Sequence, residues 1–152
     1  MPSQSGFSIL ETLSGLIVAG GLAAIAAPKL ADLQTASRIA VLQSTQGSAL
    51  AAASMGNTKA LVSHGNTGRT DEFVFIRGKH VRFNYGYPAA TADGIALLVD
   101  ISFDNGKACG AGCYEWVLTG TDGLCKTYYL DATSSLSSAD RRAHAGYVVE
   151  QC

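Results

Sequence analysis

The sequence predicts an α+β fold: a long N-terminal helix, with a transmembrane half and an amphipathic half, packs on a small head made of an antiparallel β-sheet. Three observations support this. Residues 1–57 carry four charged side chains, and the other 19 lie in residues 58–152. The charge-poor part opens with 21 residues, Phe7 to Ala27, that contain a single charge. Several short strand-like segments follow, and strands after one long helix are typical of α+β domains.

The apolar run is long enough to cross a membrane as a helix. Its 21 residues would span about 32 Å, and the hydrocarbon core is roughly 30 Å thick. A cleavable secretion signal fits less well because no Lys or Arg precedes the run, although the alanines of residues 23–27 imitate a cut site. Glu11 is costly there unless it lies at the membrane edge or meets a cation. A free amine on Phe7, created by cutting after Gly6, would supply that cation.

The helix is expected to continue beyond Pro28 to about Met55. Apolar residues recur at three- and four-residue spacings, which predicts an amphipathic half over residues 29–57. Gly56-Asn57 is the predicted stop. Pro28 has no backbone N–H, so the carbonyl of Ala24 loses its partner. We expect either a simple kink there or a segment that unwinds when subunits pack.

The head is predicted to contain five short strands with β-type composition. They lie at residues 73–76, 80–85, 114–118, 126–130 and 147–149. Arg77-Gly78-Lys79 and Asp104-Asn105-Gly106 are predicted turns. Residues 93–101 are expected to form a short helix because three apolar residues fall on one face. The sheet needs the long helix as a partner, because a head of about 95 residues has a limited core of its own.

Four cysteines, all in the head, predict two disulfides in an exported protein. Cys109, Cys113, Cys125 and Cys152 allow three connectivities. The segment from Cys109 to Cys113 is flexible enough to bridge locally, since it reads Cys-Gly-Ala-Gly-Cys. A zinc site is the alternative, but the Cys-x-x-Cys spacing of zinc knuckles is absent.

No catalytic constellation is visible in the sequence. The three histidines are isolated, and the chain has no HExxH, GxSxG or phosphate-cradling glycine motif. Asp100, Asp104 and Asn105 could meet a calcium ion, but they do not form an EF-hand loop, and surface turns explain them better. We therefore expect no enzyme activity, no metal and no cofactor.

Aromatic and basic side chains gather in the head. Core packing is the expected role of the aromatic residues, with a sugar-binding platform as the alternative: Phe73, Phe75, Phe83, Tyr85, Trp116, Tyr128 and Tyr129. Two basic groups are Arg69, Arg77, Lys79, His80 and Arg82, and Arg141, Arg142 and His144. A solvated strand and loop face is expected for both groups. DNA or an anionic cell surface is favoured only if the groups converge, and the net charge of −1 excludes wholesale capture of nucleic acid.

The N-terminal residues resemble the processing motif of type IV prepilins. In Gly6-Phe7-Ser8-Ile9-Leu10-Glu11 the glycine precedes the cut, the phenylalanine becomes the new N-terminus and the glutamate is fifth after the cut. The leader departs from the family in having no Lys or Arg. Residues 27–34, residues 86–95 and a late Cys125 followed by Cys152 resemble mannose-sensitive haemagglutinin (MSHA) pilins. These stretches cover about a third of the chain.

This resemblance implies a type IV pilin with a leader and three further parts. They are residues 1–6, a transmembrane and polymerisation helix at 7–28, the amphipathic half of that helix at 29–57 and a globular head at 58–152. A prepilin peptidase would cut between Gly6 and Phe7 and N-methylate Phe7. Glu11 and Pro28, which matches a proline of many such pilins, would act in assembly.

The preferred disulfide connectivity is Cys125–Cys152 with Cys109–Cys113. The first bond closes about 28 residues and the second about five, which correspond to roughly 3.6 and 2 kcal/mol of stabilisation in the chain-entropy model.

The implied function is that of a structural subunit of an extracellular filament for adhesion or motility. The implied partners are other copies joined through the N-terminal helices, the prepilin peptidase/methyltransferase, the pilus assembly machinery, the membrane before assembly and a host or surface receptor; DNA is not expected. The precursor would lie in the bacterial inner membrane and the assembled pilus outside the cell. The alternatives are a minor pilin, a type II secretion pseudopilin, a DNA-uptake pilin and a membrane-anchored exported enzyme.

Overall fold

The structure is a computed structural model that describes residues 8–64, 69–101, 106–121, 123–132, 142–150 and 152. The chain divides into two compact units, residues 1–37 and residues 38–152. Helix α1 (Ile9–His64) contributes to both units, and within the described residues seven strands and one short 3₁₀ helix lie in the second.

In the second unit, one narrow face of α1 is buried. The buried positions follow one another at intervals of three and four residues: Leu42, Thr45, Ala49, Ala53, Gly56 and Ala60. This spacing places them in a single stripe along a helix of 3.6 residues per turn. Most of these side chains are small, so the strands can approach the helix backbone closely.

Gly56 lies inside the helix rather than at its end. A Cβ on this residue would lie 2.8 Å from Cγ of Pro88 and 3.2 Å from Cζ of Phe83. The glycine is therefore needed for close packing of the helix on the strands. The predicted stop at Gly56-Asn57 is wrong, because tertiary packing here outweighs the low helix propensity of glycine, and α1 ends at His64.

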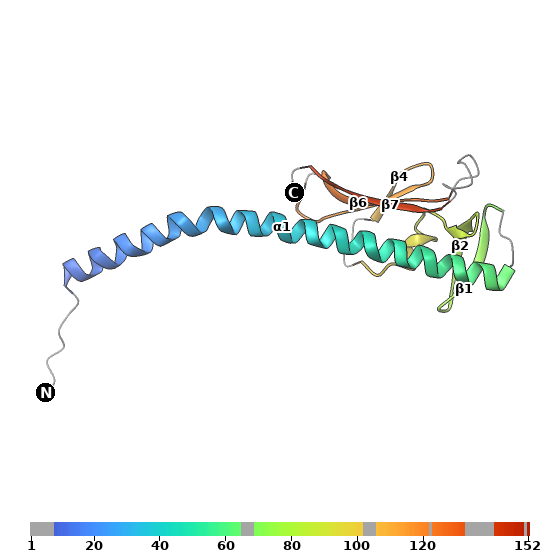
Figure 1. The fold of residues 1–152 in the computed structure, drawn as a ribbon, viewed down its shortest axis with the longest axis horizontal. Coiled ribbons are helices and arrows are strands. Elements are labelled where there is room, and N and C mark those ends of the chain that lie inside the picture. The colour runs from blue at the N-terminus through green and yellow to red at the C-terminus, as the bar shows by residue number, and fades with distance from the viewer. Residues whose placement is uncertain (1–7, 65–68, 102–105, 122, 133–141, 151) are drawn as a thin grey trace, which may run out of the picture. The chain divides into compact units, whose positions relative to one another are not determined.

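The strands form two separate antiparallel sheets. The first contains β1 (Glu72–Ile76), β2 (Lys79–Asn84) and β3 (Tyr87–Pro88), in that order. The second contains β4 (Gly106–Gly110), β5 (Cys113–Val117), β6 (Cys125–Leu130) and β7 (His144–Val149), also in chain order. Figure 1 shows β6 and β7 alongside the part of α1 in this unit, and β1 and β2 near its carboxyl end.

Each sheet has its own cluster of buried side chains against α1. Tyr114, Trp116 and Tyr129 of the four-stranded sheet pack with Ala49 and Ala53. The cluster of the three-stranded sheet consists of Val74, Val81 and Phe83 with Ala60. The buried aromatic residues therefore pack in the hydrophobic core, as expected.

Polar contacts hold the last two strands and Cys152 to the helix. The Gln46 side chain donates a hydrogen bond to the Ala145 carbonyl (2.8 Å), and the Thr127 hydroxyl donates to the Leu42 carbonyl (3.2 Å). The Arg38 guanidinium donates to the Cys152 carbonyl (2.8 Å). The predicted presence of disulfides is confirmed, and the structure contains both bonds of the preferred connectivity, Cys109–Cys113 and Cys125–Cys152.

The predicted fold class, a pilin-type helix with a transmembrane half packed on one sheet, is wrong in two respects. Within the described residues, no helix is long and apolar enough to cross a membrane. Glu11, Thr12 and Ser14 interrupt the apolar sequence near the start of α1. The strands also form two sheets instead of one, because the chain between β3 and β4 turns back against the helix instead of extending either sheet.

The segment between the sheets contains less helix than expected. Only Ile95–Leu97 forms a helical turn, the 3₁₀ helix η1, where the sequence predicted a helix over residues 93–101. The Ile95 N–H donates to the Ala89 carbonyl, and a Cβ on Gly94 would collide with that same carbonyl. These close contacts hold the segment in a tight turn that leaves no room for a longer helix.

A buried carboxylate connects the two sheets. Asp131 follows β6, and its Oδ2 accepts hydrogen bonds from the Asn84 side-chain amide (2.8 Å) and from the Ala90 N–H (3.4 Å). Nearby, the Tyr129 hydroxyl donates to the Pro88 carbonyl (2.8 Å). Burial, with a contribution from Asp131, raises the pKa of the Tyr129 phenol well above its usual value, so the phenol remains protonated and available as a donor.

We expect Asp131→Ala to lower the free energy of unfolding by about 2–3 kcal/mol, because it leaves the donors of Asn84 and Ala90 without their acceptor. Urea denaturation of both variants measures the effect. Asp100→Ala, at an exposed carboxylate, is the control and should change stability by less than about 0.5 kcal/mol. Equal losses in the two variants would contradict a linking role for Asp131.

The β1–β2 turn places an arginine in the left-handed region of the backbone. Arg77 has φ of 50° and Gly78 has φ of 80°, as a two-residue type I′ turn requires. The first position of such turns favours Asn or Asp, because other side chains strain the left-handed backbone. The sequence thus keeps an unfavourable residue at the tip of the hairpin.

We expect Arg77→Asn to stabilise the protein by about 0.5–1 kcal/mol by relieving that strain. Thermal unfolding measures the gain. Arg77→Ala removes the same charge without suiting the left-handed region, so it should bring no gain. If Ala stabilised the protein as much as Asn, charge rather than backbone strain would be the cause.

Candidate functional site

The first unit exposes an unusually apolar stretch of helix. From Ile9 to Leu22, the structure leaves seven large apolar side chains between 59% and 86% exposed: Ile9, Leu10, Leu13, Leu16, Ile17, Val18 and Leu22. We call these seven residues the assembly surface. Surface helices of folded proteins usually bury such side chains along one face. An exposed stretch of this kind marks a site of interaction.

The start of α1 satisfies most of its own polar groups. The Ser8 hydroxyl accepts from the Leu10 N–H (3.4 Å), as a helix N-cap does. The hydroxyls of Thr12 and Ser14 donate to the carbonyls of Ile9 and Glu11, at 2.9 and 3.0 Å. These hydroxyls therefore add little unsatisfied hydrogen-bonding capacity to the assembly surface.

Glu11 is the one charge between Ile9 and Leu22. It lies exposed in the first turn of α1, where the helix dipole favours a carboxylate. The four ion pairs found among the described residues all lie in the second unit, and none includes Glu11. Gly6 and Phe7 lie outside the described residues, so the predicted cut and the predicted partner of Glu11 stay predictions.

Pro28 lies within α1, which runs from Ile9 to His64 in the single chain. A proline inside a helix removes one backbone hydrogen bond and crowds the carbonyl four residues earlier, and α1 continues through it. Unwinding of the segment from Gly20 to Pro28 on assembly stays a prediction.

The candidate metal ligands do not come together within the described residues. All four cysteines are in disulfides, which removes them as zinc ligands. Within the described ranges, no three His, Cys, Asp or Glu side chains are placed to hold a metal ion. Asp100 is exposed, whereas Asp104 and Asn105 lie outside those ranges, so the calcium alternative is not settled.

The aromatic residues divide between core and surface. Phe83, Trp116 and Tyr129 are buried, as expected. Phe73 and Phe75 are about half exposed on β1, so the expectation of core packing is wrong for these two. They alternate with the buried Val74 and face outward. The Phe75 and His80 rings contact each other at a tilt of 58°, with their centres 5.2 Å apart, and the Arg82 guanidinium lies 5.6 Å from the Phe73 ring centre.

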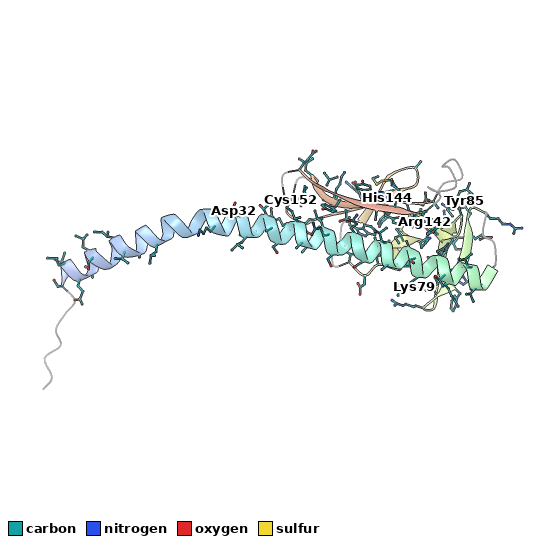
Figure 2. The ribbon with its side chains drawn as sticks, in the orientation of Figure 1. Asp32, Lys79, Tyr85, Arg142, His144 and Cys152 are labelled. Carbon is teal, nitrogen blue, oxygen red and sulfur yellow. A yellow bond between two sulfur atoms is a disulfide. The ribbon has the colours of Figure 1, made fainter. Side chains whose placement is uncertain are left out.

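Lys79 and His144, one residue from each basic group, lie apart. Figure 2 shows Lys79 and His144 apart, on opposite sides of the helix ribbon in that view. Arg82 is occupied by Asp93 at 2.9 Å and by Asp71 at 3.6 Å. Arg141 lies outside the described residues. DNA binding was favoured only if the two basic groups converged, and Lys79 and His144 do not meet this condition.

Sequence reasoning missed a groove in the second unit. It lies between α1 and the β1–β2 turn, has a volume of about 440 Å³ and is lined in part by Met55, Lys59, Arg77 and Leu98. The sequence marked Arg77 as a turn residue and as a member of a basic group, but not as part of a groove, because the groove forms between segments distant in the sequence. The one sequence signal that could have pointed to the groove is Arg77, an arginine at a turn position that favours Asn.

Comparison with known proteins identifies no matching family model, no matching curated protein and no matching solved structure. The resemblance to type IV pilins therefore rests on the residues quoted for it.

Proposed function

We propose that this chain is a structural subunit of a type IV pilus and joins other copies through the assembly surface. The observation that carries the proposal is the exposure of seven large apolar side chains on one stretch of α1, directly after the Gly6-Phe7 motif. Such exposure is unfavourable in an isolated chain and favourable in a polymer that buries it. The cut and the methylated Phe7 belong to this proposal.

The size of the apolar contribution is sufficient for association. Burial of one large apolar side chain contributes about 1.5–3 kcal/mol, so seven contribute roughly 10–20 kcal/mol. Association costs an estimated 4–15 kcal/mol in lost freedom of movement. Burial of the assembly surface therefore offsets the cost over most of this range.

The distribution around the helix favours more than one neighbour. With 100° per residue, five of the seven side chains fall within about 120°, whereas Val18 and Leu22 lie on the other side. A simple dimer would cover one face and leave the other exposed. A filament, in which each subunit contacts neighbours on several sides, covers both.

The composition of the head supports a location outside the cell after assembly. Two disulfides are typical of proteins that work in oxidising surroundings. The stages before assembly, including contact with the inner membrane and with the pilus assembly machinery, stay predictions.

Surface shearing of cells tests the proposal. We expect the chain to be abundant in the sheared filament fraction, and Leu13→Gln to reduce it there by at least about tenfold, because it puts a polar group into a buried contact. Leu61→Gln, at an exposed leucine of the same helix but in the second unit, is the matched control and should leave the yield unchanged. Absence of the unmodified chain from the sheared fraction would instead favour a pseudopilin or an anchored enzyme.

A further inference from the structure

The groove between α1 and the β1–β2 turn has the form of a small-molecule site. One wall consists of small or flexible residues of α1, and the opposite wall consists of Ile76, Arg77 and Leu98. A volume of about 440 Å³ with a mainly apolar lining falls within the range of ligand sites, roughly 300–1,000 Å³.

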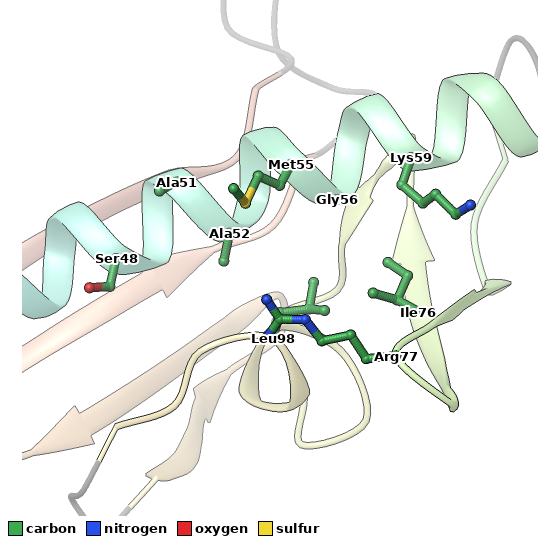
Figure 3. A pocket seen from close by; sticks show the side chains of 9 residues that line it. All are labelled: Ser48, Ala51, Ala52, Met55, Gly56, Lys59, Ile76, Arg77 and Leu98. Carbon is green, nitrogen blue, oxygen red and sulfur yellow. The ribbon is translucent and has the colours of Figure 1, made fainter.

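Arg77 is the residue that gives the groove its chemistry. Figure 3 shows its side chain crossing the groove so that the guanidinium lies over Leu98. Its backbone has φ of 50°, a conformation that disfavours arginine. Strained residues that persist in a fold often have a functional role. Within the described part of the chain, Arg77 has no ion pair, so its charge remains available.

The charge of the groove is one-sided. Lys59 is the second cation in its lining, and no Asp or Glu is among the lining residues. An adjoining recess of about 340 Å³ shares Ile76, Arg77 and Leu98 and contains Lys79 and Asp100. Among the described residues that line the groove and the recess, the one carboxylate, Asp100, belongs to the recess, so the lining of the groove itself is suited to an anion.

From these features we infer that the groove binds a single-chain amphiphilic anion, an unbranched hydrocarbon chain that ends in a carboxylate or phosphate. The hydrocarbon would lie against Met55, Leu98 and the alanines of α1, and the anionic head would pair with Arg77. This inference goes beyond the proposed function and does not depend on it.

A helix from a second copy is a poorer fit to the same space. An α-helix with its side chains is about 10–12 Å across, so two turns occupy at least about 850 Å³. That is roughly twice the volume of the groove. An extended hydrocarbon chain is much thinner and carries no backbone hydrogen-bonding groups that need partners.

Met55 provides a direct probe, because the chain contains only one other methionine, Met1. We propose to titrate the full chain, labelled with ¹³C in the methionine methyl groups, with sodium decanoate, and to follow the Met55 methyl signal by NMR. Decanoate should shift this signal saturably. Acetate, which has no tail, should not shift it, and decyltrimethylammonium, which has the opposite charge, should bind at least fivefold more weakly.

The variant that separates binding from folding is Arg77→Asn, since it suits the turn but removes the charge. It should keep the fold and weaken decanoate binding at least fivefold, whereas Arg142→Gln, at an exposed arginine outside the groove, should bind as the original chain does. Equal binding of the two decyl compounds, or unchanged binding in Arg77→Asn, would overturn the inference. A Met55 shift that depends on protein concentration without ligand would overturn it in favour of a second copy in the groove.

Discussion

Glu11→Gln is expected to abolish most filaments while the chain is still made and cut. In the polymer we expect the carboxylate to pair with the free amine of Phe7 on a neighbouring copy, within a layer that excludes water. Breaking one partner of a buried pair costs about 3–5 kcal/mol, enough to reduce assembly far more than tenfold. The yield of sheared filaments, with the N-terminus of the cell-bound chain measured in parallel, gives the result.

Glu150→Gln is the matched control, because Glu150 is an exposed glutamate at the other end of the chain. It should leave the filament yield unchanged. Normal filament yield in Glu11→Gln would show that assembly does not require an ion pair of the Glu11 carboxylate. The helix dipole alone does not predict so large a loss, since it is worth about 0.3–1 kcal/mol at an exposed position.

Removal of the Cys125–Cys152 disulfide is expected to lower the free energy of unfolding by about 3–4 kcal/mol. The bond spans 27 residues in sequence and ties the C-terminus to Cys125, a fully buried residue of β6. Without it, the hydrogen bond from Arg38 to the Cys152 carbonyl loses its anchor, and terminal segments fray readily. Denaturation of the double Cys→Ala variant measures the loss.

The Cys109–Cys113 disulfide offers an internal comparison. It spans four residues in sequence and lies in the β4–β5 hairpin, so its removal should cost only about 2 kcal/mol. An equal or larger loss than for Cys125–Cys152 would contradict the loop-length argument. Peptide mapping under non-reducing conditions checks the pairing, and a peptide linking Cys109 or Cys113 to Cys152 would contradict it.

Features with a strong local pattern could be predicted from the sequence. The first hairpin could be located because its strands flank a turn at Arg77-Gly78. Strand β5 could be located because its aromatic residues alternate, and β6 because of its β-type composition. Strand β4 was missed because Gly106 to Gly110 has little β-type composition; its place is fixed by pairing with β5. Strand β3 has only two residues, too few for any pattern.

Other features depend on contacts between distant residues. Gly56 looked like a helix stop because its closeness to Phe83 and Pro88 cannot be read from the local sequence. The same applies to Asp131, whose partners Asn84 and Ala90 lie more than 40 residues away. The apolar character of the first part of α1 was predictable because its large apolar residues lie close together in the sequence, between Ile9 and Leu22. The transmembrane assignment, made from that same run, was wrong for the described helix.

The most direct test of a pilus subunit is the N-terminal mass of the protein isolated from cells. The proposal predicts a chain that begins at Phe7 and carries one added methyl group on its amine. That single mass reports both the cut after Gly6 and the retention of the assembly surface. A mature chain that still carries Met1, or one that begins beyond Ala27, would contradict the proposal.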